Sequence, residues 1–319
     1  MPIDYESSKK EDRVNSKYRR PEKEEISFLI SNPKYSFTDM ILPANIMDEI
    51  KNIIALERYK NLIYDEWGLS AVMKNQRNVT VNLYGYSGTG KSMTAHAIAF
   101  ELDKKVILVN YSEIESKYVG ETAKNLVNLF KFAQQNDAVI VFDEADALLS
   151  KRVTAMQSAT DVSVNQTRNV LLKILDDYQG IVIFTTNFIQ NFDHAFMRRI
   201  LSHIKYELPD ESVRQKLWMH YLVNELPLIG EKSKIVNELK KIEGITGSDI
   251  SAAVLKTAVK VAANQEYGIK PDDLISEIEK IKLAKEAVEQ GDFKVTTRKV
   301  SEEYVKEKIG TGGIIHGDN

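Results

Sequence analysis

The sequence predicts an α/β fold, a parallel β-sheet with helices on both faces, followed by a smaller domain built from helices. Three observations support this prediction. Short β-branched runs alternate with helical patterns between residues 35 and 209, as in parallel sheets whose two faces are covered. After Pro209 the strand-like runs stop and helical patterns follow. The length of 319 residues suits a large domain with a smaller companion.

The individual elements follow from the spacing of apolar residues. Isoleucines recur at helical spacing within residues 45–60, which predicts a helix before the first strand. We expect strands at 78–84, 105–110, 138–144, 180–187 and 203–208. We expect further helices at 92–102, 121–135 and 168–178, and then, beyond Pro209, at 211–226, 234–243, 248–268 and 272–290.

Changes in composition divide the chain into four segments. Residues 1–34 mix both charges densely and are typical of a solvated extension, with a partner-docking arm as the alternative. The α/β domain is expected at 35–209 and the helical domain at 210–310. Residues 311–319 are rich in glycine and are expected to form a flexible tail.

Composition excludes several classes of protein. Hydrophobic residues make up 43% of the chain, enough for a sizeable core, and the net charge of −3 argues against a protein dominated by nucleic-acid binding. The absence of cysteine excludes disulfides and thiolate metal sites. The N-terminus lacks the apolar core of a signal peptide, and no apolar run is long enough to span a bilayer. We therefore expect a cytoplasmic protein.

Residues 85–92, GYSGTGKS, match the pattern G-x-x-x-x-G-K-[ST] between an expected strand and an expected helix. Glycines let successive backbone N–H groups face one concavity, and the helix that follows adds its free N–H groups and positive dipole end. A lysine and a hydroxyl at the helix start suit terminal phosphates and Mg²⁺. The expected nucleotide contacts here are Gly85, Tyr86, Ser87, Gly88, Thr89, Gly90, Lys91, Ser92 and Met93.

A second motif, VIVFDEAD (139–146), brings acidic residues to the carboxyl end of an apolar strand, where open α/β sheets bind ligands. Asp143 would complete the Mg²⁺ site with Ser92, and Glu144 would orient and deprotonate the attacking water. For Asp146 we favour capping of the next helix over ordering of the loop. Together the two motifs predict hydrolysis of a nucleoside triphosphate.

With these motifs in place, the sequence resembles the AAA+ ATPases, and more narrowly the AAA clade proper, from about Tyr35 to about Gly310. The resemblance implies a P-loop NTPase sheet sandwiched by helices, with a small helical lid, and it implies ATP and Mg²⁺ as cofactors. In GIVIFTTNFIQNFDHAFMRRI (180–200), Asn187 matches the polar sensor that positions the water. Arg198 and Arg199 match the arginine fingers that reach the neighbouring subunit's ATP, and the motif leaves open which of the two dominates.

Two further segments carry the resemblance. SKYVGETAKNLVNLF (116–130) is similar to the first pore loop of spastin and katanin, which implies that Lys117, Tyr118 and Val119 project into the channel of a ring. IEGITGSDISAAVLKTAV (242–259) is similar to the lid segment that contacts the adenosine, through Gly247 and Ser248. The segment 37–50 stands where relatives flank the adenine, which places contacts at Met40 and Ile41.

The segment 148–172 would hold a second pore loop, and its continuation also resembles ATPases of phage-tail-like contractile systems. The resemblance implies a homo-oligomeric ring, expected to be a hexamer, in which hydrolysis remodels, unfolds or disassembles a protein substrate through a central pore. Recruitment would use the extension or a separate adaptor. An ATP-dependent assembly switch is the alternative, and balanced charge makes a nucleic-acid translocase or loader the weaker third hypothesis.

Overall fold

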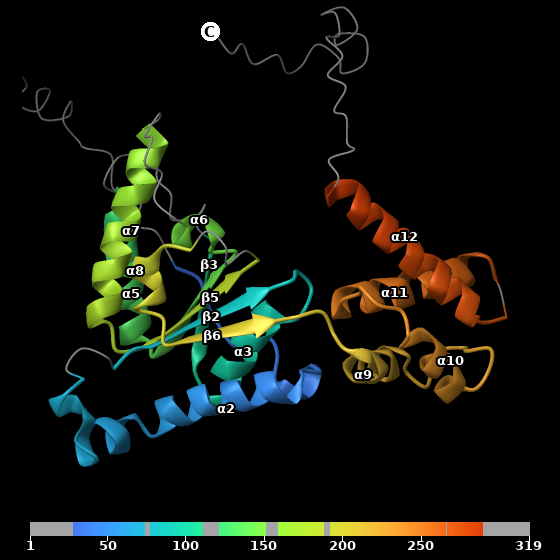
Figure 1. The fold of residues 1–319 in the computed structure, drawn as a ribbon, viewed down its shortest axis with the longest axis horizontal. Helices are drawn as coiled ribbons and strands as arrows, with labels where there is room; N and C mark the ends of the chain where they lie inside the picture. Colours follow the sequence, from blue (N-terminus) through green and yellow to red (C-terminus); the bar gives the residue numbers. More distant parts are fainter. Residues whose placement is uncertain are drawn as a thin grey trace, which may run out of the picture.

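The computed structural model describes residues 28–73, 77–110, 121–150, 159–187, 192–265 and 267–289. An α/β part and a helical part lie next to each other along the long axis of the molecule (Figure 1). The strands are β1 (Ile30–Ser31), β2 (Val79–Gly85), β3 (Lys105–Asn110), β4 (Ala138–Asp143), β5 (Ile181–Thr186) and β6 (Ser202–Tyr206). The helices of the α/β part are η2 (Phe37–Asp39), α2 (Ala44–Arg58), η3 (Leu62–Glu66), η4 (Leu69–Ala71), α3 (Lys91–Glu101), α5 (Glu121–Gln135), α6 (Asp146–Leu149), α7 (Ala159–Asp177) and α8 (His194–Met197). The helical part contains α9 (Glu211–Tyr221), α10 (Lys232–Leu239), α11 (Gly247–Ala263) and α12 (Pro271–Glu289).

The six strands form one sheet in the order β1-β3-β4-β5-β2-β6. Strands β2 to β6 run parallel, which confirms the predicted α/β class, and β1 pairs antiparallel with β3 at one edge. Parallel pairing brings the carboxyl ends of β2, β4 and β5 to the same edge of the sheet, with Tyr84 opposite Thr186. The motifs that follow these strands therefore meet there.

Two hydrophobic cores cover the two faces of the sheet. One core joins β3, β4 and β5 to α5 and α7, with Phe142 and Phe184 stacked at a centroid distance of 5.1 Å. The other core joins β2, β4 and β5 to α2 and α3 and contains the isoleucines that predicted the helix at 45–60. The result is a three-layer sandwich, with the phosphate-loop helix α3 on the second face.

The structured α/β part begins before the expected boundary at residue 35. Ile30 and Ser31 pair with Ile107 and Val106, and Phe28 packs on the ring of Phe132. The last residues of the expected extension therefore add an edge strand, because the apolar run that ends at Ile30 finds a place on the α5 side of the sheet.

Helix α7 starts at Ala159, nine residues before the predicted helix at 168–178. Its first half is rich in Ser, Thr, Asn and Asp, which have modest helix propensity, so the local pattern missed it. Packing supplies what propensity lacks, because Thr167 and Arg168 are buried and Arg168 Nη2 donates to the carbonyl of Ala147 at 2.6 Å. Part of the segment 148–172 is thus helical, and its residues 151–158 lie outside the described residues.

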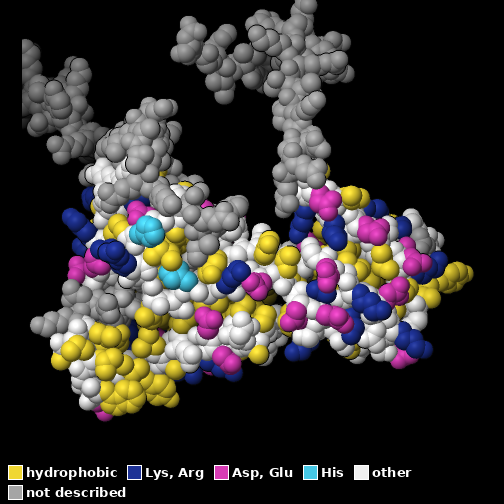
Figure 2. All heavy atoms as spheres, in the orientation of Figure 1, with side chains coloured by type: hydrophobic (Ala, Val, Ile, Leu, Met, Phe, Trp, Pro, Cys, Tyr) yellow, Lys and Arg dark blue, Asp and Glu magenta, His cyan; other side chains and the backbone are white. Residues whose placement is uncertain are grey.

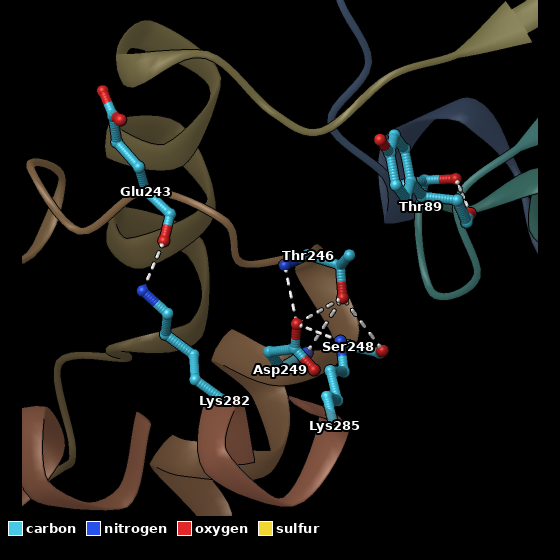
Figure 3. Close-up of polar contacts among 8 residues, drawn as sticks. Thr89, Glu243, Thr246, Ser248, Asp249, Lys282 and Lys285 are labelled. Carbon is cyan, nitrogen blue, oxygen red and sulfur yellow. Dashed lines mark hydrogen bonds and ion pairs between the residues drawn. The ribbon is translucent and has the colours of Figure 1, made fainter. Parts of the chain in front are cut away.

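The helical part has its own core around Trp218, a fully buried side chain of α9. Helix α11 starts with a capping box, in which the Asp249 carboxylate accepts from the N–H of Thr246 at 2.8 Å and from its hydroxyl at 2.9 Å (Figure 3). Lys285 of α12 donates to the same carboxylate at 2.6 Å. These contacts fix the N-terminus of α11 where it faces the phosphate loop.

Candidate active site

The loop between β2 and α3 has the backbone that its glycines predict. Gly85, Gly88 and Gly90 have φ angles of +132°, +75° and +98°, a region that glycine adopts at little cost. A Cβ on Gly85 would lie 2.0 Å from the carbonyl oxygen of Tyr206, and one on Gly88 would lie 2.2 Å from Ser248 Oγ. A Cβ on Gly90 would meet nothing within 4 Å, because this residue borders open space.

Lys91, the first residue of α3, is buried with only 7% of its surface exposed. Its ammonium donates to the carbonyls of Gly85 and Tyr86, both at 2.8 Å, and to Asn187 Oδ1 at 3.0 Å. Burial lowers the pKa of Lys91, and nearby acidic residues oppose that shift. The structure therefore brings the lysine of the first motif to the amide of the predicted sensor.

The two acidic residues of the second motif lie next to the phosphate loop. Ser92 Oγ donates to Asp143 Oδ1 at 2.8 Å, so the two predicted metal ligands are adjacent. Glu144 follows at the end of β4, lines the same cavity, and has a φ of +52°. The predicted base and metal ligands thus face one space.

Asp146 has a different role from the one we favoured. Ala145 is the N-cap residue of α6, and Asp146 is the first residue of that helix. The Asp146 carboxylate accepts from the backbone N–H of Asn187, at 3.3 Å to Oδ1. This contact orders the loop after β5, which carries the predicted sensor Asn187. The local sequence could not indicate it, because the two residues lie 41 positions apart.

The motifs enclose a cavity of about 560 Å³ between the α/β part and the helical part. Its lining includes Ser87 through Met93, Asp143, Glu144, Thr185 and Asn187 on one side. From the helical part, the lining includes Leu217, His220, Tyr221, Gly247, Ser248, Ser251, Ala252 and Leu255. The segment Asp39–Leu42 also lines the cavity. Sequence reasoning missed the α9 residues, because they have no motif and look like an ordinary amphipathic helix.

The predicted base-side contacts Met40, Ile41, Gly247 and Ser248 all line this cavity. The Ser248 N–H donates to the carbonyl of Gly88 at 3.3 Å, so the helical part touches the phosphate loop directly. The close approach requires glycine at position 88 and not at 247, where a Cβ would find its nearest atom at 3.6 Å.

The two arginines of the last motif lie outside the cavity lining of their own chain. Arg199 makes a two-point ion pair with Asp176, at 2.7 and 2.9 Å, and donates to the carbonyl of Ala195 at 3.0 Å. Arg198 is exposed and pairs with no acidic group among the described residues. The predicted pore residues Lys117, Tyr118 and Val119 lie outside the described residues.

The residues present fit a magnesium nucleoside triphosphate. The loop residues Ser87–Met93 line the cavity, a Cβ on Gly90 would meet nothing within 4 Å, and Lys91 supplies a cation there. Ser92 and Asp143 offer oxygen donors of the kind that Mg²⁺ prefers. The described residues contain no group of three or more acidic or histidine side chains that could hold a metal ion by themselves.

Together, the sheet order, the loop and the acidic pair define a P-loop nucleoside triphosphatase. Residues 81–208 match the model of the ATPase family associated with various cellular activities (AAA). The chain therefore carries an AAA ATPase domain over these residues. This match confirms the resemblance to the AAA ATPases that the motifs indicated.

The similarity to individual proteins extends beyond that domain. The chain is 29% identical over 263 residues to a proteasome-activating nucleotidase of Methanoregula boonei, covering 80% of this chain and 58% of the relative. It is 29% identical over 262 residues to the 26S proteasome regulatory subunit 4 homolog of Schizosaccharomyces pombe, covering 80% and 56%. It is 31% identical over 244 residues to cell division protein C of Sulfolobus acidocaldarius, covering 72% and 60%. The chain thus spans less than two thirds of the length of these relatives. Among the described residues, no helix is long and apolar enough to cross a membrane.

Proposed function

We propose that this chain assembles into a homo-oligomeric ring, a hexamer, in which ATP hydrolysis drives remodelling or unfolding of a protein substrate. One observation carries the proposal. Lys91, Asp143, Glu144 and Asn187 converge on one cavity, while Arg198 of the same chain is exposed outside it. A guanidinium that is always charged suits the transferring phosphoryl group. Among the described residues no arginine lines the site, which leaves this role to a neighbouring subunit.

Within the site, each side chain has a proposed task. Lys91 leaves its contacts with the Gly85 and Tyr86 carbonyls to bind terminal phosphates, and Ser92 and Asp143 hold Mg²⁺, which neutralises phosphate charge when bound. Glu144 takes a proton from the attacking water, and the Asn187 amide orients that water. Asp146 keeps Asn187 in place through its backbone N–H.

A protein substrate agrees with the charge pattern. On the face that Figure 2 shows, basic and acidic side chains are interspersed over both parts of the molecule. Nucleic-acid binding depends on clustered Lys and Arg, which this face does not present in its described residues. Similarity to proteasome-activating ATPases supports a protein substrate as well.

Mixing two inactive variants tests the shared site. Glu144→Gln removes the proposed base but keeps both arginines. Arg198→Ala keeps the base but removes the exposed arginine. If a neighbour supplies Arg198, mixed rings contain sites with an intact Glu144 and an intact neighbouring arginine, and ATPase activity returns. Activity that stays absent in the mixture, while both variants still bind nucleotide and co-assemble, would contradict the shared site.

A second experiment tests the mechanical role. Glu144→Gln rings should trap substrates, which can be identified because they co-purify. Tyr118→Ala should then keep ATP hydrolysis and abolish remodelling of these substrates. Remodelling that survives Tyr118→Ala would exclude the pore mechanism. Substrate release on assembly alone, without turnover, would favour the assembly switch instead.

A further inference from the structure

Thr185, the fifth residue of β5, lies between the two acidic residues of the active site. Its side chain is buried, with 2% of the residue exposed, and it lines the nucleotide cavity. No motif predicted a role for its hydroxyl. We propose that Thr185 is a positioning residue that holds both Asp143 and Glu144 for the reaction, an inference that rests on the proposed ATPase site.

The hydroxyl of Thr185 makes one contact with each acidic residue. Thr185 Oγ1 donates to Asp143 Oδ1 and accepts from the backbone N–H of Glu144 at 3.1 Å. Its carbonyl also accepts from the N–H of Ala145 at 2.9 Å. One residue of β5 therefore ties down three consecutive residues at the end of β4.

The backbone of Glu144 needs such a tie. Its φ of +52° lies in the left-handed region, which costs energy for a side chain with a Cβ and persists only where surrounding contacts impose it. From β5, this backbone conformation is held by the hydrogen bonds that Thr185 accepts from the N–H groups of Glu144 and Ala145. Glu144, held in this backbone conformation, lines the cavity.

The same hydroxyl sets the orientation of Asp143. Asp143 Oδ1 accepts from both Ser92 Oγ and Thr185 Oγ1, so the carboxylate is held from two elements. A partner that orients a metal ligand in this way commonly matters about 10- to 100-fold for metal affinity or activity. Removal of the hydroxyl should therefore weaken the contribution of Mg²⁺ to nucleotide binding as well as turnover.

The test compares Thr185→Val, which keeps the shape but loses donor and acceptor, with Thr185→Ser, which keeps both. Thr80→Val is the matched control, since Thr80 is fully buried in β2, where its hydroxyl accepts from Asn78 Nδ2 at 3.2 Å. Dissociation constants for ADP are measured with Mg²⁺ and in EDTA, alongside ATP turnover and thermal unfolding. Thr185→Ala replaces Thr185→Val if the latter does not fold.

We expect Thr185→Val to reduce the Mg²⁺-dependent gain in ADP affinity and the turnover number about tenfold each, with ADP affinity in EDTA unchanged. In Thr185→Ser and Thr80→Val, the Mg²⁺-dependent gain in ADP affinity and the turnover number should stay within about twofold of the unchanged protein. A purely structural role would lower the unfolding temperature without changing the ratio of the two ADP constants.

The inference would be overturned if Thr185→Val had the same ratio of ADP dissociation constants, in EDTA and with Mg²⁺, as the unchanged protein. It would also be overturned if this ratio in Thr185→Ser were as low as in Thr185→Val. Failure of the proposed function gives a different result. In that case the unchanged protein would itself show no Mg²⁺-dependent nucleotide binding and no turnover.

Discussion

The two walls of the nucleotide cavity are built on different principles. The α/β wall uses backbone N–H groups, one buried lysine and a cluster of carboxylates at strand ends. The helical wall uses mostly apolar side chains and small polar ones from α9 and α11, with Leu255 66% exposed at its rim. Under the proposed function, the first wall binds and cleaves the triphosphate and the second holds the nucleoside. The two walls touch where the Ser248 N–H donates to the carbonyl of Gly88.

Lys91→Ala should produce the largest change, because it removes the charge that binds the terminal phosphates. Loss of charge-assisted hydrogen bonds costs about 3 kcal/mol, or about 100-fold in ATP affinity. Titration with ATP and with adenosine separates the two walls. Adenosine affinity should stay unchanged, and an equal loss for both ligands would contradict the division between walls.

Gly88→Ala should disturb the contact between the walls. Its Cβ would lie 2.2 Å from Ser248 Oγ, and the φ of +75° adds strain. We expect about 1–3 kcal/mol less stability toward unfolding and about tenfold weaker ATP binding. Ser248→Ala in the same chain removes the nearest atom and should restore part of the affinity. No recovery would show that backbone strain or the contact with Thr246 Oγ1, at 2.9 Å from the added Cβ, is responsible instead.

Leu255→Ala should weaken nucleoside binding without affecting the fold. Contact with the ligand would bury part of this exposed side chain, which is worth about 1 kcal/mol, or about fivefold in affinity for ATP and adenosine alike. The free energy of unfolding should stay within about 0.5 kcal/mol of that of the unchanged protein. Leu283→Ala is the matched control, since Leu283 is 64% exposed and lies outside the cavity lining.

The smallest expected effect is a pH dependence of the nucleotide-free protein. Burial lowers the pKa of Lys91 below its ordinary 10.5, so between the lowered value and 10.5 the unfolded chain holds a proton that the folded chain has released. Stability from this group therefore increases as pH rises through that window. Denaturant unfolding of the protein and of Lys91→Met between pH 8 and pH 10.5 measures it, and a difference that stays constant with pH would contradict the effect.

Much of the α/β part could be predicted from sequence, because its signals are local. The strand β3 and the helix α5 have the predicted bounds, and both motifs lie at strand ends as expected. The first half of α7 and the edge strand β1 escaped prediction, because long-range packing stabilises them more than their own propensity does.

The sequence by itself determined the phosphate loop and the acidic pair, since each is a run of neighbouring residues whose chemistry depends on local backbone geometry. Tertiary structure alone decided which α9 residues reach the cavity, that Arg199 is paired with Asp176 while Arg198 is exposed, and that Thr185 joins Asp143 to Glu144. These relations join residues far apart along the chain, and only the register of β4 against β5 and the docking of the helical part bring them together.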